Sequence, residues 1–531
     1  MRGARTEFLR TAPVAAAGAI LTLLAVAAWP LAALLRSTTP RALLELARMD
    51  EEVRSAFVWG LAQSTAATTA GVVFGLATAY CWARLRYPGR TLLRGLAVAP
   101  LAIPAISLAA GIEALFAPGT PASDLVSFVG LSPARLHSGT GAVIVSHGLL
   151  ATAIVGWFAS VAWASADART VDAARTLGAG RIRAARVAVW PAVWPAALAG
   201  AGVAFLQSML SYGVVLILAR GRETPEGLSV RLMLVDDGRA AAVALLTVAY
   251  TLICGLVTIQ LLRSPAGQSG RRRPPQPARG LDRLVALVAA VPAFLVAGAV
   301  VALLFRASGG DGGLTAAHWR GLMEGADAGA VRRAALGSLL AAVPAAALAA
   351  AWGGMAGAAL GRMRGAGGML RASALLLPLA LSPAALIYGW RLASPGTDAR
   401  VLLPLVQAAE ALPFVAGTVI RMRPRWDPAT LIAARTLGAR RLRAWRVLRG
   451  PSYLIAAGVG FLVSFGLVFG EATVATVARV PGDTLPVRLL ELDRLGAAGP
   501  AAALAAVILV VSVLAFTLGD PIIARLGRAR R

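Results

Sequence analysis

Lysine is absent from this sequence of 531 residues, and all 52 of its basic side chains are arginines. A phosphate-binding P-loop needs a lysine after its glycines to reach the β- and γ-phosphates of a nucleotide. The absence of lysine therefore excludes such a loop. If ATP drives this protein, another chain must hydrolyse it.

Cysteine and histidine are also scarce. The two cysteines, Cys81 and Cys254, lie inside apolar stretches, so the sequence predicts neither a disulfide framework nor a CxxC metal site. The three histidines, His137, His147 and His318, are too few and too scattered to predict a metal centre or a Ser/His/Asp arrangement. We therefore predict no catalytic residue, no metal and no cofactor.

Apolar residues, in contrast, dominate the chain. They make up 58% of it, and the mean hydropathy is +0.72, which is too apolar for a soluble protein of this size. A helix that crosses a bilayer needs about 20 mostly apolar residues. We therefore predict an all-α polytopic protein with the lipid bilayer as its solvent and about twelve transmembrane helices, at residues 12–35, 56–83, 95–117, 141–165, 192–219, 239–262, 284–306, 333–360, 372–393, 401–420, 452–478 and 497–517.

The net charge of +27 is compatible with nucleic-acid binding or with a membrane protein, so the placement of the arginines decides. If the N-terminus is cytoplasmic, 34 of the 52 arginines but only six of the 25 acids fall in the inner loops, inner flanks and tails. This excess is typical of cytoplasmic loops. No basic, aromatic-interleaved domain exists outside the spans. We predict no nucleic-acid partner, a multi-pass location in a bacterial inner membrane and two cytoplasmic termini.

The chain divides near its middle. Residues 263–283 are rich in Pro, Gly and Arg and predict a cytoplasmic linker between a first transmembrane domain, 1–262, and a second, 284–531. Seven residues, Ala173–Ala179, recur identically as Ala433–Ala439, at an offset of 260. A weaker match follows an offset of 278. Both copies lie on the same predicted face, so the halves are parallel six-helix repeats.

The repeated segment lies in the inner loop between the fourth and fifth spans of each half. Residues 172–187 combine small or apolar positions with arginines, which predicts a short amphipathic helix on a membrane surface or in the groove of a partner. Gly178 allows a turn or a close backbone approach, and Pro191 begins the return into the bilayer. A duplicated basic loop that only maintains topology is the alternative, but it does not explain why the loop diverges less than the spans.

The order Asp172-Ala173-Ala174, then Gly178, then Pro191 resembles the EAA loop of permeases from ABC-type importers. The second copy keeps the alanines, the glycine and the proline but has Ile432 where that family usually has an acid. The residues that the resemblance assigns to coupling with an ATPase are Asp172, Ala173, Ala174, Arg175, Gly178, Ala433, Ala434, Arg435 and Gly438.

The resemblance implies a type I ABC importer-like permease fold. It also implies two partners: two copies of a cytoplasmic ABC ATPase subunit, each holding one of the loops in a cleft, and an extracytoplasmic substrate-binding protein. Two halves fused in one chain of this length resemble the thiamine and ferric-iron importers. The layout of spans four to six, with the loop Gly221–Pro225, favours thiamine over iron.

Polar side chains within the spans are candidates for a translocation pathway, because an ionisable group in lipid is costly and defaults to a functional role. His147 aligns with Gln407 at the offset of 260, and three of the candidates are acids that suit a cationic cargo. The alternative is that each bonds a neighbouring helix or reaches water at a span end. The candidates are Glu113, His147, Gln207, Tyr212, Gln407, Glu410, Ser464 and Glu471.

Two other functions stay open at this point. A secondary transporter can also be built from parallel six-helix repeats, and it would follow an ion gradient instead of ATP. A membrane scaffold would carry no cargo at all. Neither alternative explains the paired loops as directly as coupling to an ATPase does.

Overall fold

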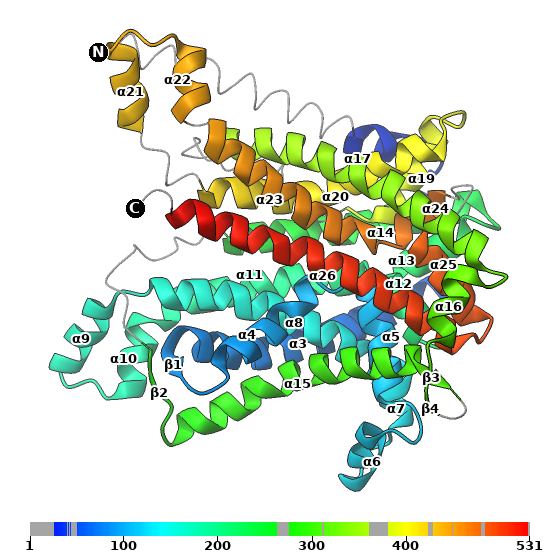
Figure 1. Cartoon of the computed structure of the whole chain (residues 1–531), viewed down its shortest axis with the longest axis horizontal. Coiled ribbons are helices and arrows are strands. Elements are labelled where there is room, and N and C mark those ends of the chain that lie inside the picture. The colour runs from blue at the N-terminus through cyan, green and yellow to red at the C-terminus, as the bar shows by residue number, and fades with distance from the viewer. Residues whose placement is uncertain are drawn as a thin grey trace. The chain divides into compact units, whose positions relative to one another are not determined.

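The computed structural model describes residues 26–39, 41, 43, 50–262, 275–310, 313–360, 381–422, 428–448, 450–478 and 484–528. They are mostly helical (Figure 1). The chain forms two compact units: unit 1 comprises residues 1–39, 329–488 and 508–531, and unit 2 comprises residues 40–328 and 489–507.

Unit 2 contains the helices of the first sequence half from α3 onward and the first two helices of the second half, α15 and α16. Two pairs of short strands accompany them: β1 (Leu85–Arg86) pairs in parallel with β2 (Gln276–Pro277), and β3 (Gly309–Gly310) pairs with β4 (Gly313–Leu314). Its helices are α3 (Glu51–Arg84), α4 (Arg90–Val98), the 3-10 turn Ala99–Leu101, α5 (Ala105–Leu115), α6 (Pro121–Phe128), α7 (Ala134–His137), α8 (Thr140–Ser165), α9 (Ala168–Thr176), α10 (Arg181–Ala188), α11 (Trp190–Met209), α12 (Gly213–Leu218), α13 (Pro225–Leu232), α14 (Asp237–Leu262), α15 (Leu281–Ala307) and α16 (Ala317–Glu324).

Unit 1 contains the helix Val26–Arg36 and most helices of the second half. They are α17 (Ala328–Leu360), α19 (Pro383–Ala393), α20 (Ala399–Met422), α21 (Pro428–Thr436), α22 (Arg441–Leu448), α23 (Gly450–Phe469) and α24 (Thr473–Ala478). Two further helices, α25 (Leu485–Arg494) and α26 (Ala498–Arg528), contribute residues to both units.

Seven of the described helices are long and apolar enough to cross a bilayer: α3, α8, α11, α14, α15, α17 and α26. The pair Arg90–Leu101 and Ala105–Leu115 makes an eighth if it is one span, bent by 117°. These helices confirm an all-α multi-pass membrane protein. A helix overlaps each of the twelve predicted segments, but the count of twelve spans stays a prediction.

The second and fourth spans of each half cross at an equivalent point. A Cβ atom placed on Gly75 of α3 would lie 2.8 Å from the Cβ of Val155 on α8. A Cβ on Gly353 of α17 would lie 2.6 Å from the Cβ of Val415 on α20. The two glycines are 278 positions apart and the two valines 260, which are the offsets of the sequence repeat. Both crossings depend on glycine because no side chain fits between the helices.

The first helix of each half packs outside its own half. Within unit 2, α15 packs on α5, where a Cβ on Gly111 would lie 2.8 Å from the carbonyl oxygen of Ala299. Within unit 1, the indole nitrogen of Trp390 donates to the carbonyl oxygen of Val26, 3.1 Å away. The compact units therefore have other bounds than the two sequence halves, 1–262 and 284–531. The division into these halves is predicted from the composition of the linker, and it stays a prediction.

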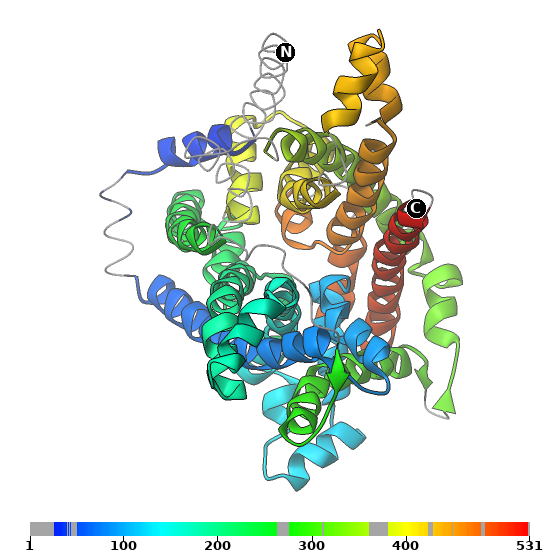
Figure 2. The same ribbon diagram turned by 90° about the vertical axis from the view of Figure 1, so that its left-hand side faces the viewer.

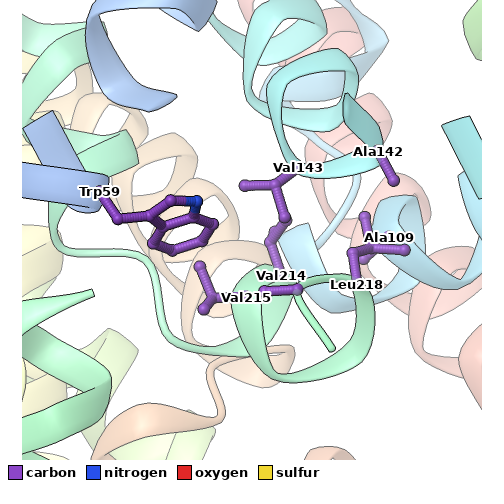
Figure 3. Close-up of a cluster of buried hydrophobic side chains, with 8 residues drawn as sticks. Trp59, Ala109, Ala142, Val143, Val214, Val215 and Leu218 are labelled. Carbon is purple, nitrogen blue, oxygen red and sulfur yellow. The ribbon is translucent and has the colours of Figure 1, made fainter. Parts of the chain in front are cut away.

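A buried apolar cluster anchors α12 in unit 2. Figure 3 shows Val214, Val215 and Leu218 of α12 against Trp59 of α3 and Val143 of α8. The indole nitrogen of the tryptophan donates to the hydroxyl of Thr140, 3.0 Å away, so the ring is fixed at both its apolar face and its polar edge. The short helix α12 is therefore part of the packed interior.

Candidate functional site

The first predicted coupling loop, residues 168–188, is a hairpin of two short helices. Asp167 caps α9 by accepting a hydrogen bond from the Arg169 amide, at 3.0 Å. The helix ends at Gly178, whose φ of +82° is left-handed. The amides of Gly178 and Ala179 donate to the carbonyl oxygens of Arg175 and Ala174, at 3.0 Å each. This is the Schellman end of a helix, which glycine favours.

The single helix predicted over 172–187 is therefore wrong in its middle. The chain forms α9, a turn and then α10, because the left-handed glycine satisfies the last carbonyls of α9 and redirects the backbone. The turn itself is where Gly178 predicts it. In Figure 1, α9 and α10 project at one end of unit 2, whereas α6 and α7 lie at the other end.

The second predicted coupling loop, residues 428–448, repeats this geometry. Gly438 has φ +85°, and its amide donates to the carbonyl of Arg435 at 3.0 Å. The amide of Ala439 donates to the carbonyl of Ala434 at 3.0 Å. Figures 1 and 2 both show α21 and α22 projecting from the ends of α20 and α23. The loops are thus the same structure twice, each within its own unit.

Both hairpins expose a leucine at the turn. Leu177 and Leu437 are each 87% exposed, and Ile182 on α10 is 84% exposed. The alanines behind the turn are less exposed, with Ala174 and Ala434 half-buried. Most of the other predicted coupling residues are exposed: Asp172, Ala173, Arg175 and Ala433. Arg435 is half-buried. An apolar side chain in this position suits a partner surface.

Sequence reasoning missed these two leucines. The signal was present, because both belong to the seven identical residues of the repeat. Their apolar character was assigned to a helix face, whereas the break at the glycine places them at the tip of the hairpin.

The fifth span of each half is broken, although the sequence predicts continuous spans at 192–219 and 452–478. In unit 2 the chain leaves helix between α11 and α12, at residues 210–212. In unit 1 it does so between α23 and α24, at residues 470–472. The two breaks lie 260 positions apart, so they belong to the repeat.

A buried glutamine holds the first break. The amide nitrogen of Gln63, in the middle of α3, donates to the carbonyl of Ser208 at the end of α11, 3.1 Å away. Its amide oxygen lies 2.9 Å from Nδ1 of His147 on α8. All three residues are buried. The carbonyl freed by the break is therefore satisfied by a side chain from another span.

A carboxylate holds the second break. Glu471 accepts hydrogen bonds from the amides of Thr473 and Val474 at the start of α24, the latter at 3.0 Å. The side chain of Gln407 on α20 hydrogen-bonds this carboxylate. Because Gln407 aligns with His147, the fourth span of each half supports the break in the fifth.

The predicted pathway residues are thus divided between breaks, helix interiors and an ion pair. Tyr212 lies buried in the first break, Gln207 is half-buried on α11, and Ser464 is fully buried on α23. Glu410 is half-buried on α20. Gln63, which the sequence reading missed, was visible as a lone amide within a long apolar span. The roles of these residues in a pathway stay predictions.

Glu113 has a structural partner. Its carboxylate lies 3.2 Å from the Arg306 guanidinium, so the pair joins α5 to α15 in unit 2. Nδ1 of His137 lies 2.9 Å from the Glu113 carbonyl oxygen. Among the described residues, no group of three or more His, Cys, Asp or Glu side chains is placed to hold a metal ion.

Replacing Gln63 tests the polar link at the first break. Gln63→Leu leaves the Ser208 carbonyl and His147 without this partner in a site away from water, and we expect a loss of about 1–3 kcal/mol of stability. Thermal unfolding of the purified chain in detergent measures it. Thr69→Val on the same helix is the control, because its hydroxyl is exposed and bonds only its own helix. Equal melting temperatures for the two variants would contradict the link.

Residues 71–263, which include the first coupling loop and the first break, match the model of the family "Binding-protein-dependent transport system inner membrane component". A sulfate transport system permease protein of Salmonella typhimurium is 30% identical over 210 residues, which are 71% of that relative and 37% of this chain. The chain belongs to this family. It is a permease subunit of an ABC importer.

Other relatives extend the similarity along the chain. A thiamine transport system permease protein of Brucella abortus is 26% identical over 471 residues, which cover 82% of each chain. The spermidine/putrescine transport system permease protein of Escherichia coli is 30% identical over 115 residues, 22% of this chain and 43% of that relative. These relatives are transport permeases and not enzymes. Permeases of this family work with an ATPase and a substrate-binding protein, and the family name places them in the inner membrane.

Proposed function

We propose that this permease carries thiamine into the cell. The observation that carries the proposal is the similarity to a thiamine permease over 82% of both chains, because it includes both halves and their fusion. Sulfate is the second candidate, since a sulfate permease is 30% identical to the chain over 210 residues. That match covers 37% of the chain, which is less than the length of one of its two halves.

The charge of the candidate pathway residues supports a cation. Three of them, Glu113, Glu410 and Glu471, are acids, and a sulfate dianion would meet unfavourable charge at each ionised one. Glu113 is already paired with Arg306, so the unfavourable charge for sulfate comes from the two acids of unit 1. The fused halves also suggest ferric iron as a cargo. Ferric iron is a cation too, but a pathway for it needs side chains that can bind a metal.

Two copies of a separate ATPase subunit bind the coupling loops in this proposal, one at each hairpin. The exposed Leu177 and Leu437 enter apolar sites on the ATPase, and closure of the ATPase pair on ATP moves each hairpin with the fourth and fifth spans attached to it. An extracytoplasmic binding protein delivers the cargo. Both termini and both hairpins lie on the cytoplasmic face, as the distribution of arginines predicts.

Reconstitution into proteoliposomes tests the proposal. The chain is combined with its cognate ATPase and binding protein, and uptake of radiolabelled thiamine, sulfate and ferric iron is compared with and without ATP. We expect ATP-dependent uptake of thiamine alone. Uptake of sulfate alone, or of iron alone, would assign the other cargo. Uptake that follows an imposed ion gradient without ATP would instead support a secondary transporter.

A further inference from the structure

The short helix α6, at the end of unit 2 away from the first coupling hairpin, exposes an apolar face. Leu125, Phe128 and Val129 are 64%, 89% and 61% exposed. They stand three and four residues apart, which places them on one side of a helix. Ser127, which is also exposed, lies on the opposite side. The helix is therefore amphipathic, and its apolar side chains point away from the protein.

Packing within unit 2 contributes little to α6. The helix has eight residues and takes part in none of the main helix contacts among the described residues. Its first turn is capped, because the Thr120 hydroxyl accepts a hydrogen bond from the Ser123 amide at 3.2 Å and the Ser123 hydroxyl donates to the Thr120 carbonyl at 2.8 Å. A lone helix shorter than about 12–15 residues is nevertheless marginal in water. A contact on the apolar face is therefore needed to keep α6 helical.

The chain on either side holds α6 near one end of the membrane spans. Five residues separate it from α5 and five from α7, and such a connection reaches no more than about 18 Å. The helix α7 is itself tied to the spans. Nδ1 of His137 lies 2.9 Å from the Glu113 carbonyl oxygen, and the Glu113 carboxylate pairs with Arg306 near the end of α15. Because ionisable groups are costly in hydrocarbon, this pair marks the level at which α5 and α15 reach the membrane surface.

The helix α6 also lies beside a surface that faces lipid. The helix α15 is long and apolar enough to cross the bilayer, and Leu287, Phe294 and Phe305 along it are exposed. Figures 1 and 2 both place α6 at the same margin of unit 2 as α15. The apolar face of α6 therefore continues the lipid-facing surface of α15 at its end.

We propose that α6 lies in the lipid headgroup layer, on the membrane face opposite the first coupling hairpin, with Leu125, Phe128 and Val129 in contact with the acyl chains. Amphipathic helices bind membranes in this way, with the apolar side buried about 5–10 Å into the boundary. A soluble protein is the alternative occupant, but interfaces that form and separate are only about as apolar as the rest of a protein surface. The three side chains of this face carry no polar atom. The inference depends on neither the cargo nor the ATPase.

Spin labels on α6 of the full chain test the proposal. Cys81 and Cys254 are replaced by alanine, and this parent, treated with the label, gives the blank. A single nitroxide is then attached in Leu125→Cys, Val129→Cys or Ser127→Cys, with the other residues of α6 unchanged. Each chain is reconstituted in vesicles of phosphatidylethanolamine and phosphatidylglycerol. Relaxation of the label by oxygen, which concentrates in lipid, is compared with its relaxation by a water-soluble nickel chelate.

The ratio of oxygen to nickel accessibility should be several-fold higher at Leu125 and Val129 than at Ser127. Ser127 is the matched control, because it lies two residues from each of them on the polar side of the same helix. High nickel accessibility at all three positions would mean that water surrounds α6. Protection of Leu125 and Val129 from both reagents would mean that protein covers them. Either result overturns the proposal.

Discussion

Gly178→Val together with Gly438→Val should reduce ATP-dependent uptake at least tenfold while the purified chain still folds. Both glycines have a left-handed φ, +82° and +85°. In this conformation the folded hairpin is destabilised by about 1–2 kcal/mol for a residue with a Cβ, and by more for a β-branched residue. Each hairpin would therefore abandon its Schellman turn, and Leu177 and Leu437 would no longer be presented to the ATPase. Since about 1.4 kcal/mol is a factor of ten, we expect uptake to fall by at least tenfold.

The expected loss is specific to coupling. A Cβ on either glycine would have no heavy atom within 4 Å, so the substitutions create no clash inside the units. Melting temperature in detergent should therefore remain close to that of the parent chain, while pull-down of the ATPase and uptake both decline. Uptake at the parent level, with both valines in place, would count heavily against the role of the hairpins.

A substitution two residues after Gly178, in the same hairpin, serves as a control. Gly180 also has open space around it, but its φ is −60°, which any residue adopts. The second hairpin carries Arg440 at the equivalent position, so the fold already accepts a side chain there. Gly180→Ala should therefore leave uptake and ATPase binding unchanged, which separates backbone conformation from a general sensitivity of the loop.

The turns of the hairpins could be predicted from the sequence, and the breaks in the fifth spans could not. A glycine between two short basic segments is a local signal, and the left-handed turn follows from it. The run 192–219 is apolar throughout, so periodicity and composition indicate one helix. At the break, the carbonyl oxygen of Ser208 accepts a hydrogen bond from the side chain of Gln63, which lies 145 positions earlier in the chain. Tertiary packing brings these two residues together, so no local pattern predicts the break.

The same distinction applies to the units. The composition of residues 263–283 marks a linker, which suggests that each half packs on itself. The position of α15 on α5 depends on the fit between Gly111 and Ala299, which no local pattern records. Candidate residues in spans were found by polarity alone. Polarity could not separate Glu113, paired with Arg306, from Glu471, which holds a helix break.

Gly71→Ala should destabilise the chain strongly, because it adds a methyl group where two helices of unit 2 are in close contact. The new Cβ would lie 2.3 Å from the Cβ of Ala151 on α8, whereas carbon atoms in contact prefer about 3.5–4.0 Å. The largest helix interface of the unit, between α3 and α8, would have to open by about 1 Å. Overpacking of this kind costs about 1–3 kcal/mol, and sometimes more. Helices in lipid depend on such close packing, because burial from water does not drive their association.

A compensating substitution makes this prediction decisive. Ala151→Gly removes the atom that Gly71→Ala would strike, so the double variant should regain at least half of the lost melting temperature, although the Ala151 backbone carbon at 2.9 Å remains close. Gly95→Ala in α4 is the control, since nothing lies within 4 Å of its Cβ and alanine favours helix. If Gly71→Ala melts like Gly95→Ala, the second and fourth spans are not in close contact at their crossing, and Gly75 and Gly353 lose their role as contact points as well.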